Sequence, residues 1–575
     1  ATQQFFEKLI ELDPQAHEQT LWDGKLFDTK LDSNWKVFVQ CESNGALLSY
    51  LRYKSELLQY LSLALHRLAS TGGKSHIKSQ IDLLISNRLC SARIFSFLDS
   101  LSYGNVPTDY ETLKDLSLFK NIPINLETVT LRNDCKGNIY DFSAINSLME
   151  VTQRARLTTG HNTASDPNYL SLSERVTHES RVIFKTITEF LSRKTYMDNQ
   201  LSILHSWVQL VEIVISDGQL APLERSNFIL EVFSSIVPKI NDYIELNISF
   251  SEELVSLAVV LFDVYQKDRN EIDRFQSVDS RLYNLFKACI HGINSPLTTL
   301  SIRSDFYVLA NSYLVRILND EKLARPVLQD FKMNSEVLVD VICSDSVYGQ
   351  GTNRITGIFL MDSLIRLGDL NKENFILSSL TKNTYLLLII RSIKNTDDLF
   401  SSPSENISID DLLYELTAFK SIVYLLIRIA ENRNGAQALI QSKLFKVIGN
   451  CSFLKLDTDL GLELFFDEMT VKNSSLLSVN VSLDKPLYFG KDANGVSLFE
   501  IVVPVFQLIS AVLLSMGSAN LTVIREVKEL LAKFRKLSLG IMKRDALKDT
   551  NEKYHLSGSS ADGLQQMVKL IVMLC

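Results

Sequence analysis

Apolar residues recur at helical spacing from Ile407 to Asn450, and this stretch sets the pattern for the whole chain. The apolar positions of its first helix fall into two rows, Leu412, Leu416, Phe419, Val423, Leu426 and Ala430 in one and Leu413, Ile422, Leu425 and Ile429 in the other. A helix that is apolar over so much of its circumference is buried between neighbours on two sides. Ser408 is the predicted N-cap, and Asn434-Gly435 is the predicted break before a second helix that ends near Ile448. The stretch therefore predicts a helical hairpin that needs cover on both faces.

The same periodicity runs through most of the chain. One early helix is predicted over Ala46–Leu68, whose leucines return to one helix face. The later predicted helices are Glu174–Lys194, Asp198–Ser216, Leu223–Asn241, Glu252–Tyr265, Arg281–Ile290, Asp305–Asn319, Pro326–Cys343, Ile355–Arg366, Asn374–Lys394, Asp457–Thr470, Leu498–Met516, Ala519–Met542 and Leu564–Leu574. Their mostly short connections place successive helices antiparallel beside one another. No strict period recurs, which indicates degenerate repeats of the HEAT and armadillo kind.

We therefore expect an all-α protein, a right-handed α-solenoid built from irregular HEAT/armadillo-like helical hairpins. The 575 residues exceed what one core normally spans, and only 22 Gly and 11 Pro favour long helices over sheets. Three parts are predicted. Residues 1–135 form a helical segment ending in an irregular loop with at most one short strand. Residues 136–400 form a middle HEAT-like solenoid, and residues 401–575 form a C-terminal armadillo/HEAT-like tail with an insertion at 471–496.

Charge, cysteines and hydropathy narrow the functional class. Lys and Arg number 59 against 67 Asp and Glu, and the net charge of −8 gives no support to general nucleic-acid binding. Seven cysteines are scattered, never in C-x-x-C, which favours a reducing compartment with thiols packed as small core residues. The longest apolar run, Ile501–Met516, is shorter than the roughly 20 residues that a bilayer requires and contains Pro504, so we predict a core helix. The first residue is not Met and the last residues are apolar, which suggests a fragment.

Candidate catalytic and ligand motifs are weak. Gly349-Gln350-Gly351 follows no predicted strand, and its spacing fits neither G-x-G-x-x-G nor a P-loop. A turn between helices is therefore predicted. Cys289 and His291 stand two apart and do not share a helix face, which disfavours a metal site. His205, before Trp207, is predicted to be a core or rim histidine. Without G-x-S-x-G or H-E-x-x-H, we expect no enzyme activity, no metal and no cofactor.

Two charged segments stand out. Asp459, Glu463 and Asp467 are four apart and would form an acidic row along a helix, which is either a solvated face or a docking rim for a basic partner segment. The segment Arg525–Lys548 holds eight basic and three acidic residues. It is either a solvated ridge or a surface for phosphates or an anionic membrane, and its single aromatic, Phe534, serves base stacking poorly.

Several segments resemble the C-terminal region of the large inner-ring scaffold nucleoporins of the nuclear pore. They are Arg428-Ile429-Ala430, Gly435-Ala436-Gln437-Ala438-Leu439-Ile440 with Leu444-Phe445, Val505 to Gly517, and Ile541-Met542-Lys543-Arg544-Asp545. The resemblance is sharpest over Ile407 to Asp545. It implies a karyopherin-like, non-catalytic scaffold at the nuclear pore complex of the nuclear envelope, with a role in nucleocytoplasmic transport of protein and mRNA. It also implies that the partners are inner-ring linker nucleoporins and the channel-nucleoporin anchor protein. No small-molecule substrate and no direct nucleic acid are expected, and membrane contact is expected only through the pore assembly.

Our functional hypothesis is a helix-in-groove scaffold, with the groove near the central hairpin and the two long helices after it. Aromatic side chains dominate interface hot spots, so the partner-binding candidates combine aromatics with the acidic row. The candidates are Phe465, Phe466, Tyr488, Phe489, Phe499, Asp459, Glu463 and Asp467. Ordinary core packing would explain the same aromatics. The alternative function is a soluble karyopherin-like transport receptor or another HEAT-repeat adaptor.

Overall fold

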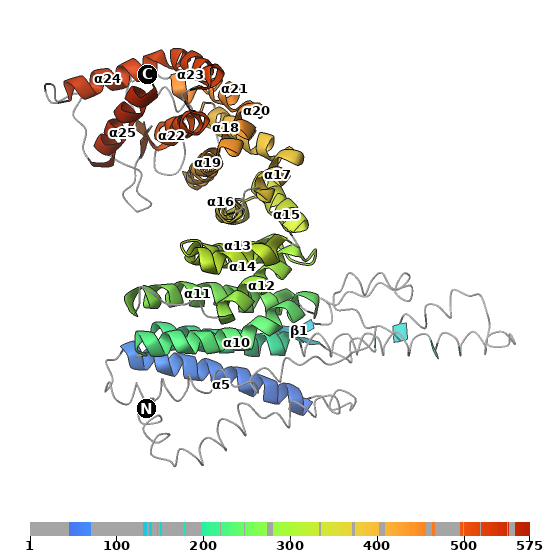
Figure 1. Cartoon of the computed structure of the whole chain (residues 1–575). Coiled ribbons are helices and arrows are strands. Elements are labelled where there is room, and N and C mark those ends of the chain that lie inside the picture. The colour runs from blue at the N-terminus through green and yellow to red at the C-terminus, as the bar shows by residue number, and fades with distance from the viewer. Residues whose placement is uncertain are drawn as a thin grey trace. The chain divides into compact units, whose positions relative to one another are not determined.

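The computed structural model (Figure 1) is helical in nearly all the residues that it describes. These residues are 45–70, 130–134, 137–140, 147, 150, 151, 154, 174, 177, 178, 181, 197–218, 220–246, 248–272, 280–332, 335–370, 374–401, 409–455, 463–465, 495–497, 499–517, 519–548, 550 and 558–574. Only two small antiparallel strand pairs interrupt the helices there, so the predicted all-α class is confirmed. The chain forms two compact units, Ala1–Ser277 and Val278–Cys575.

The first unit is held together by helices that pack along their lengths. These are α5 (Gly45–Ser70), helical backbone at 197–216, α10 (Pro222–Leu246) and α11 (Ile248–Ile272). The hydroxyl of Ser55 on α5 lies 2.9 Å from that of Ser206. The neighbouring Trp207 is fully buried. His205 is half exposed and lies 3.2 Å from Glu253 of α11, so it is a rim histidine.

The second unit repeats with a period of three helices. Its helices are α12 (Ser280–Asn294), α13 (Leu300–Ile317), α14 (Glu321–Lys332), α15 (Ser335–Tyr348), α16 (Thr352–Gly368), α17 (Phe375–Lys382), α18 (Tyr385–Ser401), α19 (Ile409–Ala430), α20 (Arg433–Gln441), α21 (Leu444–Ile448), the 3-10 turn η4 (Phe453–Lys455), α22 (Phe499–Met516), α23 (Leu521–Lys533), α24 (Arg535–Leu547) and α25 (Gly558–Leu574). One row of contacts runs α13–α16–α19–α22–α25, and a second runs α12–α15–α18–α21 (Figure 1). In these two rows each helix packs on the helix three places further along the chain, as in armadillo-type repeats.

Polar contacts show that the helices of the first row run parallel. Near the start of α16, Thr356 lies 3.1 Å from Ser304 of α13. Further along both helices, Ser363 donates a 2.6 Å hydrogen bond to Asn311. The same order is found between α19 and α22, in the pairs Lys420–Glu500 and Ala430–Ser515. Parallel stacking of equivalent helices is consistent with a solenoid, and the right-handed α-solenoid form stays a prediction.

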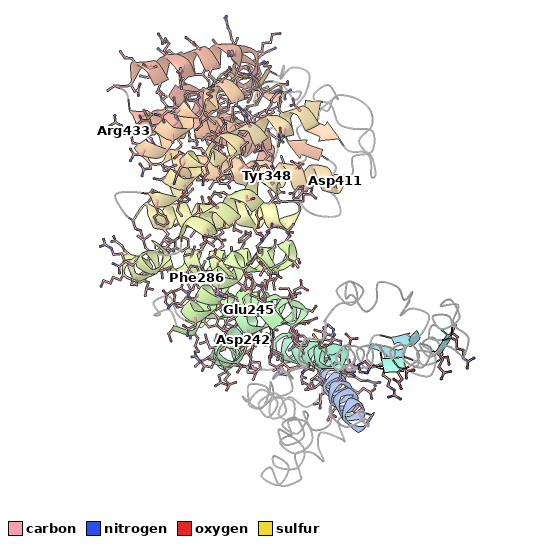
Figure 2. All side chains as sticks on the ribbon, turned by 90° about the vertical axis from the view of Figure 1, so that its right-hand side faces the viewer. Asp242, Glu245, Phe286, Tyr348, Asp411 and Arg433 are labelled. Carbon is pink, nitrogen blue, oxygen red and sulfur yellow. The ribbon has the colours of Figure 1, made fainter. Side chains whose placement is uncertain are left out.

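Aromatic rings join the two rows at the start of the second unit. Phe286 of α12, labelled in Figure 2, stacks on Tyr313 of α13 with 4.9 Å between ring centroids. Tyr283, one turn earlier on α12, lies 6.2 Å from the same ring. Offset aromatic pairs add stability beyond the apolar area that they bury. The α12–α13 hairpin is therefore packed internally by aromatic side chains.

Two predicted long helices are each divided into two, which corrects the ranges Asn374–Lys394 and Ala519–Met542. The first is covered by α17 and α18 and the second by α23 and α24, whereas α14 and α15 cover the predicted helix Pro326–Cys343 on either side of residues outside the described part. Thr384 separates α17 from α18 with a left-handed φ of 61°. Phe534, fully buried, ends α23 and precedes α24. Neither residue is a Gly or Pro, so the sequence carries no ordinary signal for these breaks.

The break in the central hairpin also lies earlier than predicted. Helix α19 ends at Ala430, and Asn432 caps α20 by accepting a 3.1 Å hydrogen bond from the N–H of Asn434. Gly435 lies inside α20, where an added Cβ would stand 1.9 Å from the carbonyl oxygen of Ile429. The glycine thus permits close packing and does not end the helix. The predicted second helix is two helices, α20 and α21, joined through Lys443 at φ 64°. The predicted cap Ser408 lies outside the described residues.

A β-hairpin stands where at most one short strand was predicted. Strand β1 (Thr130–Asp134) pairs antiparallel with β2 (Gly137–Tyr140). The prediction of at most one strand is therefore wrong, because the backbone of Thr130–Asp134 pairs with that of Gly137–Tyr140.

A second strand pair corrects the predicted helix Asp457–Thr470. Strand β3 (Glu463–Phe465) pairs antiparallel with β4 (Gly495–Ser497). The helix prediction is therefore wrong for these three residues. The pair encloses 466–494, close to the predicted insertion at 471–496.

Helix α22 is the most apolar helix in the described part of the chain. It is also the one helix there that is long and apolar enough to cross a membrane, with 67% of its 18-residue window buried within the protein. It packs against α19 and α25, as expected of the predicted core helix. The predicted module boundaries at 135 and 400 stay predictions, and α18 and α19 pack against each other across the second.

Candidate interaction site

A cavity of about 300 Å³ opens between the end of the central hairpin and α23. Its lining comes from α20, α21 and α23, all in the second unit. The lining residues are Ile440, Lys443, Phe445, Lys446, Glu526, Glu529, Leu530 and Lys533. The cavity lies in the region where the sequence placed a groove, beside the central hairpin and the helices after it.

The chain builds the first wall with a tight turn between two helices. Helix α20 ends at Gln441, and Lys443 adopts the left-handed conformation that lets α21 start at the next residue. Phe445 turns inward and is 7% exposed, while Lys446 remains exposed. A non-glycine residue at positive φ is strained, and packing around it must hold it there.

The second wall is α23, which approaches the end of α21 closely. Asn520 caps α23 by accepting a hydrogen bond from the N–H of Val523. A Cβ at Gly449 would lie 3.1 Å from Leu530 and 3.3 Å from the Nζ atom of Lys533. The absence of a side chain at Gly449 therefore lets α23 settle against the hairpin.

Charge is distributed unevenly over the two walls. Lys443 and Lys446 stand on the hairpin side, and Glu526 and Glu529 stand on α23, with Lys533 at its end. None of these five side chains has an ion-pair partner among the described residues. The floor between them is apolar, formed by Ile440, Phe445 and Leu530.

This arrangement suits recognition of a partner segment. A partner side chain can fill the apolar floor while charged groups beside it pair with the lysines or the glutamates. The lining holds no Ser, Cys or His. Over the part of the chain that the structure describes, no group of three or more His, Cys, Asp or Glu residues is placed to bind a metal.

The predicted aromatic candidates are only partly visible. Phe499 is 4% exposed and packs against Gly563 of α25, so a partner would have to displace α25 to reach its ring. Phe465 lies in β3, and only its backbone is described. Phe466, Tyr488 and Phe489 lie outside the described residues. Partner binding by all five aromatics stays a prediction.

The predicted acidic row does not lie on a helix at its central residue. Glu463 is the first residue of β3 and pairs with Ser497 in the backbone, so spacing by four does not place it on a common helical face with the other two. Asp459 and Asp467 lie outside the described residues. A docking role for these three carboxylates stays a prediction.

The other motifs that the sequence singled out have structural places. Gly351 lies at φ 61° in the turn between α15 and α16, directly before Thr352, as predicted for a turn between helices. Cys289 is 1% exposed on α12, whereas His291 faces solvent. In the basic segment, Arg544 is buried and Lys548 pairs with Asp545 at 2.9 Å. The sequence indicated the region of the cavity but not its lining residues, because the two walls are about 80 residues apart along the chain.

The sequence is similar to proteins of known identity. The sequence model of a family described as "Nup192: Nuclear pore complex scaffold, nucleoporins 186/192/205" matches residues 1–575. Nucleoporin NUP192 of Chaetomium thermophilum is 22% identical over 522 residues. That alignment covers 80% of this chain and 28% of the relative, so the chain spans well under half of the relative's length.

Proposed function

Because the chain belongs to the nuclear pore complex scaffold family of nucleoporins 186, 192 and 205, we propose that it is a scaffold segment of the pore's inner ring that binds short segments of other nucleoporins. Its family places it at the nuclear pore complex. Stacked helices of this kind can offer grooves that suit linear or helical partner segments. The proposed partners are linker nucleoporins and the channel-nucleoporin anchor protein, and the proposed role is support of pore assembly and nucleocytoplasmic transport.

The cavity between the hairpin and α23 carries this proposal. Its apolar floor and five charged rim groups, which have no ion-pair partner among the described residues, leave hydrophobic and electrostatic interactions open to a partner. Lys443 and Lys446 would form ion pairs with carboxylates of a bound segment. Glu526 and Glu529 would form ion pairs with its basic residues. Because Lys443 and Lys446 stand on the hairpin wall and both glutamates stand on α23, where Lys533 is the one basic lining residue, a segment with separated charges would bind in a preferred orientation.

Charge reversal of the hairpin wall tests the proposal. The 575-residue chain carrying Lys443→Glu and Lys446→Glu should lose most of its capture of purified inner-ring linker nucleoporin segments, at least about tenfold in affinity, or about 1.4 kcal/mol. Both lysines are exposed, so the helical circular dichroism signal and the melting temperature should change little.

The matched control is Lys322→Glu, an exposed lysine in the first turn of α14 where a negative charge suits the helix dipole. It makes one similar charge change in the same unit, away from the cavity lining. Equal capture by the double variant, the control and the native chain would show that linker segments do not bind at this cavity.

A further inference from the structure

Helix α24 presents a second surface that the cavity does not include. Its inner face is buried through Leu537, Gly540, Ile541 and Arg544. On the opposite side, Leu539 is 57% exposed and Met542 is 38% exposed. These two residues lie three apart, so they are neighbours on one helix face.

Basic side chains flank this apolar pair at both ends. Arg535 and Lys536 precede Leu539 by about one turn, and Lys543 follows Met542 directly; all three are exposed. Neither Arg535 nor Lys536 has an ion-pair partner in the described part of the chain. The acidic residue of α24, Asp545, is already paired with Lys548. The exposed face therefore combines an apolar centre with positive charge, and that of Arg535 and Lys536 has no ion-pair partner among the described residues.

We propose that this face of α24 is a docking site for an acidic amphipathic helix of a partner protein. Leucine-type side chains of that helix pack over Leu539 and Met542, and its flanking Asp and Glu residues pair with Arg535, Lys536 and Lys543. The inference deepens the proposed function, on which it rests for the existence of partner segments, and adds a surface separate from the cavity.

The surface favours a peptide over an anionic membrane. Two partly exposed apolar side chains offer little area for insertion into a bilayer, and even a single myristoyl chain gives only marginal membrane binding. Three cationic residues around two apolar ones match the footprint of about two turns of a partner helix, roughly 11 Å. Such a helix places apolar anchors at i and i+3 or i+4, as this face requires.

The test uses a labelled peptide of about 14 residues with Leu at every third or fourth position and Glu elsewhere. Its binding to the 575-residue chain is followed by fluorescence anisotropy at about 0.05 M and 0.3 M salt. Binding should weaken at the higher salt concentration. It should fall at least about tenfold with Arg535→Glu plus Lys536→Glu and also with Leu539→Ser plus Met542→Ser.

Charge exchange separates a specific site from general attraction. A peptide with Lys in place of each Glu should bind the Arg535→Glu, Lys536→Glu chain better than it binds the native chain. Native binding should persist in the Lys322→Glu control and in the cavity variant Lys443→Glu, Lys446→Glu. Because the cavity variant tests the proposed function with linker segments, the two proposals fail separately.

Three results would overturn the inference. They are no binding of the acidic peptide to the native chain, equal binding by the charge-reversed chain, and sedimentation with phosphatidylserine vesicles that depends on Arg535 and Lys536 when the peptide does not bind. The last result would assign the face to a membrane. Circular dichroism melts confirm that each variant remains folded.

Discussion

The buried carboxylate of Asp397 on α18 accepts a 2.7 Å hydrogen bond from the backbone N–H of Ser452, the residue before η4. It also accepts a 3.0 Å hydrogen bond from the N–H of Phe453 and pairs with Lys394 at 2.6 Å. Asp397 is fully buried. One carboxylate thus ties α18 to a turn more than 50 residues further along the chain, and this turn also contacts α24.

Removal of this carboxylate should destabilise the second unit. Asp397→Ala leaves the backbone N–H groups of Ser452 and Phe453 without their acceptor and leaves Lys394 to its second partner, Asp398, which should lower the free energy of unfolding by about 3 kcal/mol. Chemical denaturation measures the loss. Asp398→Asn is the control, because Asp398 also pairs with Lys394 but is 65% exposed, and it should cost less than about 0.5 kcal/mol. Equal effects would contradict the capping role of Asp397.

Gly435 should tolerate no side chain. Alanine would place a Cβ 1.9 Å from the carbonyl oxygen of Ile429, and backbone atoms must move to relieve that contact. We expect Gly435→Ala to lower the free energy of unfolding by about 2 kcal/mol or more, although alanine is the better helix former. Gln437→Ala, at an exposed position of the same helix, should change it by less than about 0.5 kcal/mol. A stabilised Gly435→Ala protein would show that the helix start can relax.

The fold was largely predictable because apolar periodicity reports directly on burial. The row through Leu416, Phe419 and Val423 identified α19, and all three are at most 2% exposed. Breaks were missed where they depend on tertiary packing. Thr384 adopts a left-handed φ between α17 and α18. Phe534 lies between α23 and α24 and is fully buried, so it fits the apolar pattern of one continuous helix. Neither break is marked by a Gly or Pro, so the sequence alone does not indicate it.

The candidate site was predictable only in its location. The sequence indicated a groove beside the central hairpin. It could not show that Lys446 and Glu529, which are far apart along the chain, line the same cavity. That pairing arises because Gly449 lets α23 approach, a contact that depends on the fold. The sequence placed Lys533 in a basic segment that was either a solvated ridge or a surface for phosphates or an anionic membrane, and the structure places it in the cavity lining.

Glu212 should make the first unit more stable as the pH falls from neutrality. Burial, followed by the nearby charge of Glu253, raises the pKa of Glu212 above its ordinary 4.5, although His205 opposes the shift. The unfolded chain therefore loses this proton at a lower pH than the folded chain does. Stability is lost as the pH rises from about 4.5 towards the raised pKa, and it is regained on acidification.

The variant Glu212→Gln removes this ionisation. It should raise the melting temperature at about pH 7, with a gain in the free energy of unfolding below about 1 kcal/mol, and this gain should shrink towards zero as the pH falls below about 4.5. Glu231→Gln on α10, an exposed position, should shift the melting temperature little at either pH. A gain for Glu212→Gln that is the same at both pH values would exclude ionisation as its cause.

Three cysteines should be unreactive until the chain unfolds. Cys289, Cys343 and Cys451 are at most 1% exposed, and each is a free thiol. Burial raises the pKa of all three, to about 12 for Cys451, which also lies near the carboxylate of Asp397. Because the thiolate is the reactive form, alkylation at about pH 8 should be slow for two independent reasons, access and ionisation.

Peptide-resolved mass spectrometry after iodoacetamide treatment measures this directly. The three thiols should remain unlabelled in the native chain and become fully labelled in about 6 M guanidinium chloride. Asp397→Ala should speed labelling of Cys451 selectively, because it releases the turn next to that residue, whereas Cys289 on α12 should keep its native rate. Rapid native labelling of Cys289 or Cys343 would mean that their helices open far more often than their burial indicates.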